Sequence, residues 1–138
     1  MSDEPDASYM PDTRGPQAQS DPDADPRCLF CRVVAGTVPS EQVYQDDDVV
    51  AFRDINPKAP THVLIIPRRH VSGINAPDAA DGPMLAAMVR AAQTVARAEG
   101  VAEGGYRLVW NVGPDAGQSV FHLHLHLLGG RPLGWPPG

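Results

Sequence analysis

Histidine and leucine alternate over residues 122–127, and this alternation limits the possible folds more than any other feature of the chain. Successive side chains of a β-strand point to opposite faces, so His122, His124 and His126 are expected on one face and the leucines on the other. A leucine face packs on a core, whereas buried imidazoles without partners cost free energy. The pattern therefore predicts a strand at a sheet edge whose histidine face binds something.

Two kinds of site suit this row of imidazoles. Two histidines and a further ligand can hold a catalytic metal ion with an open coordination position. Alternatively, one neutral histidine attacks phosphorus while its neighbours bind the phosphoryl oxygens. The preceding segment, residues 113–119, has one acidic residue, Asp115, and offers backbone amides, the Gln118 amide and the Ser119 hydroxyl. These neutral donors favour phosphoryl or nucleotidyl chemistry.

The body of the chain has the pattern of an α+β domain. A short apolar stripe ending at a glycine predicts a helix over residues 27–36, and a 3.6-residue period predicts a long helix over residues 83–100. Strands are expected over residues 43–45, 49–53, 62–67, 106–111 and 120–128, the first two as a hairpin around three aspartates. Five short strands with one long and one short helix form a mostly antiparallel sheet.

Charge and composition separate residues 1–26 from the rest. This segment holds six Asp, one Glu, one Arg and five Pro, with no Leu, Ile, Val or Phe, so we expect a disordered acidic tail before a domain over residues 27–138. The tail carries the whole net charge of −6, and the neutral body argues against nucleic acid as a partner. The sequence has neither a signal peptide nor an apolar run of membrane-spanning length, so a cytoplasmic protein is expected.

Cys28 and Cys31 form a Cys-x-x-Cys pair, and the chain has no other cysteine. A disulfide framework is therefore excluded. A redox pair, two inert buried thiols and a zinc site remain as interpretations. Zinc is favoured, because two thiolates supply half of a tetrahedral shell and two neutral histidines would complete it.

The segment Gly-Gln-Ser-Val-Phe-His-Leu-His-Leu-His-Leu-Leu, residues 117–128, resembles the signature of the histidine-triad (HIT) family. Residues 54–57, 59–62 and 66–67 also match it. The ends Gly129-Gly130-Arg131 and Trp135-Pro136-Pro137-Gly138 are similar to those of the Hint branch, the purine nucleoside phosphoramidate hydrolases. The resemblance covers residues 28–138 and implies a HIT fold, with a homodimer formed through the long helix and an edge strand.

The resemblance also implies an activity, namely hydrolysis of purine nucleoside 5′-phosphoramidates, such as those of adenosine, to the monophosphate and an amine. His124 would be the nucleophile that forms a nucleotidyl-histidine intermediate, with His126, His62 and Ser119 as the other catalytic residues. The implied nucleotide-binding residues are Phe30, Phe52, Asp54, Ile55, Asn111, Gly117, Gln118 and Ser119.

The implied metal is a structural zinc on Cys28, Cys31, His70 and His122, and no organic cofactor is expected. Two alternatives to the phosphoramidase remain. One is a dinucleoside polyphosphate hydrolase or nucleotidyl transferase, and the other is a nucleotide-binding adaptor with incidental catalysis.

Overall fold

The computed structural model describes residues 24–138, so the acidic tail predicted over residues 1–26 lies almost wholly outside the described residues. The helices and strands are α1 (Leu29–Ala35), β1 (Gln42–Gln45), β2 (Val49–Arg53), β3 (Thr61–Pro67), α2 (Gly82–Ala98), β4 (Tyr106–Val109) and β5 (Leu125–Gly129). Two short 3₁₀ helices, η2 (Pro77–Ala79) and η3 (Pro114–Ala116), were not predicted. No helix within residues 24–138 combines the length and the apolar character needed to cross a bilayer.

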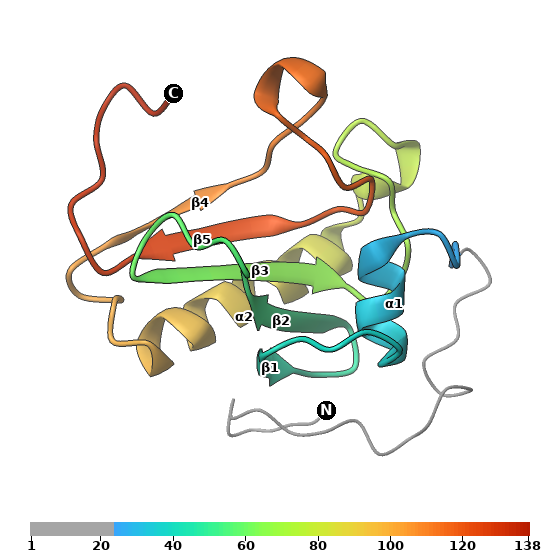
Figure 1. Cartoon of the computed structure of the whole chain (residues 1–138), viewed down its shortest axis with the longest axis horizontal. Coiled ribbons are helices and arrows are strands. Elements are labelled where there is room, and N and C mark those ends of the chain that lie inside the picture. Colours follow the sequence, from blue (N-terminus) through green and yellow to red (C-terminus); the bar gives the residue numbers. More distant parts are fainter. Residues whose placement is uncertain (1–23) are drawn as a thin grey trace.

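The strands form one five-stranded antiparallel sheet in the order β1-β2-β3-β5-β4 (Figure 1). This confirms the predicted α+β class, with its long and short helix and its antiparallel hairpin. The hairpin turn is fixed by Asp46, whose Oδ1 accepts hydrogen bonds from the backbone amides of Asp48 and Val49 at 2.8 and 2.9 Å. Short acidic side chains thus close the turn, as their sequence pattern predicts.

The two faces of the sheet are covered by different helices, and each face has its own core. On one face, α2 packs apolar side chains such as Met88 against Val63 and Ile65 of β3 and Leu125 of β5. On the other face, α1 packs against Val50, Phe52, Leu64 and Ile66. This second core is smaller and covers only part of its face. The half-buried His124 and His126 lie beside this core.

The helix ends follow from local chemistry. The Cys28 sulfur accepts a hydrogen bond from the Cys31 amide at 3.2 Å at the start of α1, and α1 ends at Gly36 with a left-handed φ of 77°. A side chain with a Cβ rarely adopts that φ, so glycine is favoured there. Asp81 caps α2 by accepting from the Met84 amide at 3.0 Å. Both predicted helices are therefore confirmed.

The strand predicted over residues 120–128 differs from β5, which begins only at Leu125. Its partner β4 ends at Val109, opposite His126, and the other partner, β3, ends at Pro67. The ladder with β3 ends at the pair Ile65–Leu125, and the Leu123 amide instead donates to the Val71 carbonyl at 2.6 Å. The expectation of an edge strand is wrong, since β5 lies between β3 and β4.

Candidate active site and candidate metal centre

The predicted single row of histidines is divided between two sites. Leu123, Leu125 and Leu127 are buried in the α2 core, as the alternation predicts. His124 and His126 lie side by side with ring centroids 5.1 Å apart, but the fully buried His122 turns toward the cysteines. His122 precedes the regular part of β5, so strand alternation does not fix its direction.

His124 has a defined proton position. Its Nδ1 lies 2.7 Å from the backbone carbonyl oxygen of His122. A carbonyl oxygen can only accept, so Nδ1 carries the hydrogen and Nε2 of the neutral ring carries a lone pair. Burial lowers the pKa of His124, outweighing the hydrogen bond to the His122 carbonyl, and the edge-on ring of Phe30 is 5.1 Å away. His124 therefore offers an uncharged nucleophilic nitrogen.

His62 and His126 form a directed chain of hydrogen bonds that starts from the backbone, which we call the relay. The Lys58 amide donates to His62 Nδ1 at 3.0 Å, so the hydrogen of the neutral His62 ring lies on Nε2. That Nε2–H donates to His126 Nδ1 at 2.9 Å. The hydrogen of His126 is thus on Nε2, 3.5 Å from the Asn111 amide nitrogen. The His126 Nε2–H and the Asn111 amide are both donors, so they cannot hydrogen-bond to each other. A phosphoryl oxygen placed beside them can accept from both.

Burial keeps the relay uncharged. It lowers the pKa of His62, although the Asp54 carboxylate, 3.5 Å from His62 Nε2, acts in the opposite direction. Burial, together with the neighbouring His124 and His62, lowers the pKa of His126 to about 4. The three imidazoles are therefore neutral near pH 7, which leaves a lone pair on one and a hydrogen-bond donor on the next.

A pocket of about 320 Å³ opens beside these rings. His124, His126 and Ser119 line one side, and Asp54 and Ile55 line another. Its remaining lining residues are Leu29, Phe30, Val33, Val38, Pro39, Ser40, Phe52, Arg53, Leu64 and Val120. Seven of the catalytic and nucleotide-binding residues predicted from the sequence therefore line the pocket. Val38, Pro39 and Ser40, from the connection between α1 and β1, also line it and were not predicted.

Four nominated residues do not line this pocket. His62 lies behind His126, and Asn111 lies beside it. The Gln118 side chain accepts from the Gly113 amide at 3.0 Å and donates to the carbonyls of Ser72 and Val120, so it holds the loop together. Gly117 provides the left-handed φ of 82° that ends η3 in the same loop.

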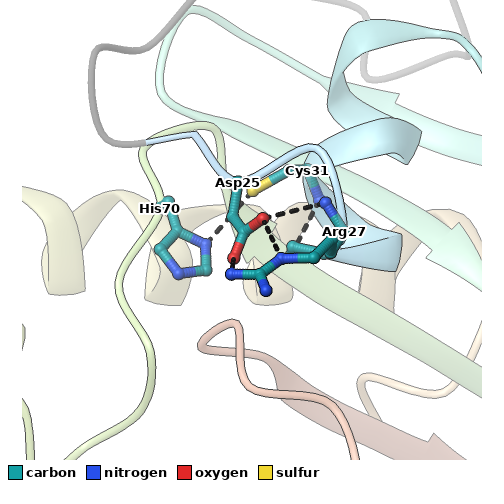
Figure 2. Close-up of polar contacts among 5 residues, drawn as sticks. Asp25, Arg27, Cys31 and His70 are labelled. Carbon is teal, nitrogen blue, oxygen red and sulfur yellow. Dashed lines mark hydrogen bonds and ion pairs between the residues drawn. The ribbon is translucent and has the colours of Figure 1, made fainter.

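The second group is the Cys/His cluster of Cys28, Cys31, His70 and His122, whose ligand atoms all lie within 4.8 Å of one another. Figure 2 shows Cys31 and His70 directed toward each other, and the Cys31 sulfur is 3.1 Å from His70 Nδ1. His122 Nδ1 is 3.5 Å from each sulfur. Its Nε2 lies 2.9 Å from the Pro67 carbonyl and so carries the hydrogen, which leaves a lone pair on Nδ1 for a metal. The donor set fits tetrahedral zinc.

Asp54, His62 and His126 also bring ligand atoms within 4.8 Å, but they do not suit a metal. The Lys58 amide occupies His62 Nδ1, so the nitrogen facing the other two residues carries a hydrogen. To bind a metal through Nε2, the neutral His62 ring would have to lose this hydrogen and become an anion. The Lys58 amide, which donates, and the Pro67 carbonyl, which accepts, decide this difference. Both are backbone groups, and no residue type in the sequence signals them.

The comparisons with known proteins agree with this geometry. The HIT domain family matches residues 35–133. The chain is 51% identical to a HIT family hydrolase from Legionella pneumophila Philadelphia 1 of known crystal structure, with a TM-score of 0.78 over 81% of this chain and all of that one. The chain belongs to the HIT family of hydrolases.

Two curated relatives narrow the similarity further. A purine nucleoside phosphoramidase of Escherichia coli (strain K12) is 49% identical over 106 residues, which are 77% of this chain and 89% of the relative. A 14 kDa zinc-binding protein of Zea mays is 46% identical over 116 residues, covering 83% of this chain and 90% of the relative.

Proposed function

We propose that this hydrolase acts on purine nucleoside 5′-phosphoramidates and releases the nucleoside monophosphate and an amine. The observation that carries the proposal is His124, a neutral ring with its Nδ1–H fixed on a carbonyl and its Nε2 lone pair available beside a pocket. The name of the Escherichia coli relative supports this substrate class over a dinucleoside polyphosphate.

In the proposed reaction, His124 Nε2 attacks the α-phosphorus and the P–N bond breaks. The leaving nitrogen takes a proton, for which the Ser119 hydroxyl at the pocket wall is the donor. Water then cleaves the phosphorus–His124 bond, giving its hydroxyl to phosphorus and a proton back to Ser119, so one phosphoramidate and one water give one monophosphate and one amine. The N–H groups of His126 and Asn111 bind the phosphoryl oxygens as negative charge develops.

The nucleoside would lie in the pocket with its base in the apolar slot of Phe30, Phe52 and Ile55. Asp54 lies at the same wall and can accept from the two ribose hydroxyls. Gly117 and Gln118 would contribute by holding the loop that leads to Ser119. Shape and polarity of the lining support this orientation of the substrate.

We also propose a structural zinc on Cys28, Cys31, His70 and His122, and a domain over residues 27–138 that includes these ligands. When bound, zinc would cross-link α1 to the chain just before β5. The lone pair left on His122 Nδ1 by the Pro67 carbonyl supports the assignment, as does the zinc-binding relative from Zea mays.

A homodimer formed through α2 and an edge strand is the proposed assembly. Val89 of α2 and Leu108 of the edge strand β4 are 40% and 39% exposed, and Trp135 is 81% exposed. Apolar side chains of this size favour a covered surface. Sedimentation analysis gives the test, and a monomer at micromolar concentration contradicts the assembly.

The activity is tested with a fluorogenic adenosine 5′-phosphoramidate. We expect His124→Ala and His124→Asn to lower kcat/KM by about 10³-fold or more, because the attacking group is lost. Binding of adenosine monophosphate to the variants, measured by calorimetry, shows whether the pocket is intact. Equal rates in wild type and variants with intact binding would rule out His124 as the nucleophile.

A further inference from the structure

A second pocket of about 510 Å³ adjoins the first, and the proposed reaction does not use it. Leu29, Ser119 and Val120 line both pockets, so the two meet at these side chains. The other residues of the second pocket are Asp25, Arg27, Cys28, His70, Ser72 and Phe121. The second pocket therefore extends from Ser119 over the Cys/His cluster.

The position of Ser119 indicates what the second pocket can hold. The proposed function, on which this inference rests, assigns the nucleoside to the first pocket and the leaving nitrogen to Ser119. Displacement at phosphorus proceeds in line, so the leaving group departs away from the attacking nitrogen. A substituent on the leaving amine then extends past Ser119 and into the second pocket.

The polar lining of the second pocket includes Asp25 and Arg27, which form an ion pair. Figure 2 shows these two side chains together. Arg27 Nε and Nη2 lie 3.3 Å from the two carboxylate oxygens of Asp25, and the Arg27 backbone amide donates to Asp25 Oδ1 at 2.9 Å. Both oxygens of Asp25 are thus engaged. Within residues 24–138 the third guanidinium nitrogen of Arg27, Nη1, has no hydrogen-bond partner.

Exposure makes the cation the accessible member of this pair. The side chain of Arg27 is 90% exposed, against 36% for Asp25. A ligand entering the pocket meets an unfilled guanidinium donor and a carboxylate that already has its donors. The charged group it accommodates is an anion.

The apolar wall complements this cation. Leu29 and Phe121 are 43% and 63% exposed, although both are large apolar side chains. Their surface can contact hydrocarbon that lies between the leaving nitrogen and the anionic group. The pocket thus combines an apolar contact with a single cationic donor.

We propose that the second pocket is a leaving-group subsite, in which Arg27 binds a carboxylate carried by the leaving amine. The carboxylate forms a charge-assisted hydrogen bond with the guanidinium, and the hydrocarbon contacts Leu29 and Phe121. Asp25 holds the guanidinium in place.

The test compares two adenosine 5′-phosphoramidates, one of glycine and one of glycinamide, which differ in carboxylate against carboxamide. The measured quantity is the ratio of kcat/KM for the glycine substrate to kcat/KM for the glycinamide substrate. The two amines also differ in intrinsic reactivity, but this difference is the same for every variant. A change in the ratio between variants therefore reports on binding of the carboxylate. We expect Arg27→Gln to lower this glycine-to-glycinamide ratio about fivefold, the size of an exposed ion pair. Arg27→Lys should retain most of the ratio because it keeps the charge.

Arg97→Gln is the matched control, because it removes the same charge from an exposed residue of α2, on the opposite face of the sheet. It should leave the ratio unchanged. Raising the salt concentration to about 1 M should bring the wild-type ratio toward that of Arg27→Gln, since screening weakens exposed pairs. The thermal unfolding midpoint and zinc content of each variant are compared with those of the wild type.

An unchanged ratio in Arg27→Gln, or an equal fall in Arg97→Gln, overturns the subsite while leaving the phosphoramidase intact. If the wild type releases adenosine monophosphate from neither substrate, the proposed function itself fails and the subsite fails with it. A fivefold fall confined to Arg27→Gln, with the ratio retained in Arg27→Lys, supports the subsite.

Discussion

The Cys/His cluster and the relay both gather potential metal ligands within 4.8 Å, yet they suit opposite tasks. In the Cys/His cluster, the Pro67 carbonyl takes the hydrogen of His122 and leaves a lone pair facing the sulfurs. In the relay, the Lys58 amide takes the lone pair of His62 and leaves a hydrogen facing its neighbours. One backbone hydrogen bond in each cluster therefore distinguishes a candidate metal centre from a chain of proton donors.

The largest expected effect is on zinc content, which should depend on the Cys/His cluster and not on the relay. Wild type should purify with about one equivalent of zinc, and Cys31→Ser should lose it and unfold with a free energy lower by about 3–5 kcal/mol, because a structural metal is lost. Metal analysis and denaturant unfolding measure the two quantities. Less than about half an equivalent in the wild type would contradict the zinc site.

The next effect belongs to the relay. His62→Asn should lower kcat/KM for the fluorogenic phosphoramidate about 10–100-fold, because His126 loses the partner that places its hydrogen on Nε2. Zinc content should remain at the wild-type value, in contrast to Cys31→Ser. A loss of zinc in His62→Asn would show that the two clusters are not separate.

The pH dependence of the activity tests His124, the proposed nucleophile beside the relay. Activity requires His124 to be unprotonated, and burial lowers its pKa below the ordinary value of 6.5. The acid limb of kcat/KM should therefore fall below pH 6.5. Between pH 7 and pH 5.5 the rate should fall by less than the roughly tenfold loss expected of an unperturbed histidine. A midpoint at or above 6.5 would contradict a buried neutral nucleophile.

The smallest effect tests the helix that contacts both sites, since α1 carries Cys31 of the cluster and Phe30 of the pocket. Gly36→Ala places a Cβ at a φ of 77° and should lower the free energy of unfolding by about 1 kcal/mol. Zinc content and kcat/KM of the folded variant should not change. A change in either would mean that the helix end, and not only its buried face, positions the sites.

Residue patterns predicted most of the fold because each element depends on local signals. The apolar stripes of α1 and α2, the aspartates of the β1–β2 turn and the leucines of the last strand each identified their element. The early end of the ladder before Leu125 was not predicted, because it depends on where β4 ends and on the Val71 carbonyl that the Leu123 amide binds, both distant in sequence.

The residues of the candidate site could be predicted where the residue type alone indicates the chemistry. The histidines, the cysteines and the nominated lining residues Phe30, Phe52, Asp54 and Ile55 meet in space as the resemblance implied. The proton positions were not predictable, because backbone groups set them. Nor was the second pocket, since Asp25 and Arg27 lie in a segment whose composition indicated only a solvated tail and its boundary.

The bond from Lys58 to His62 comes from the main chain and not from the lysine side chain. Every amino acid except proline provides that amide, so substitutions at position 58 can leave the tautomers of His62 and His126 unchanged. The peptide unit at this position, and not its side chain, determines which nitrogen of His126 carries the hydrogen.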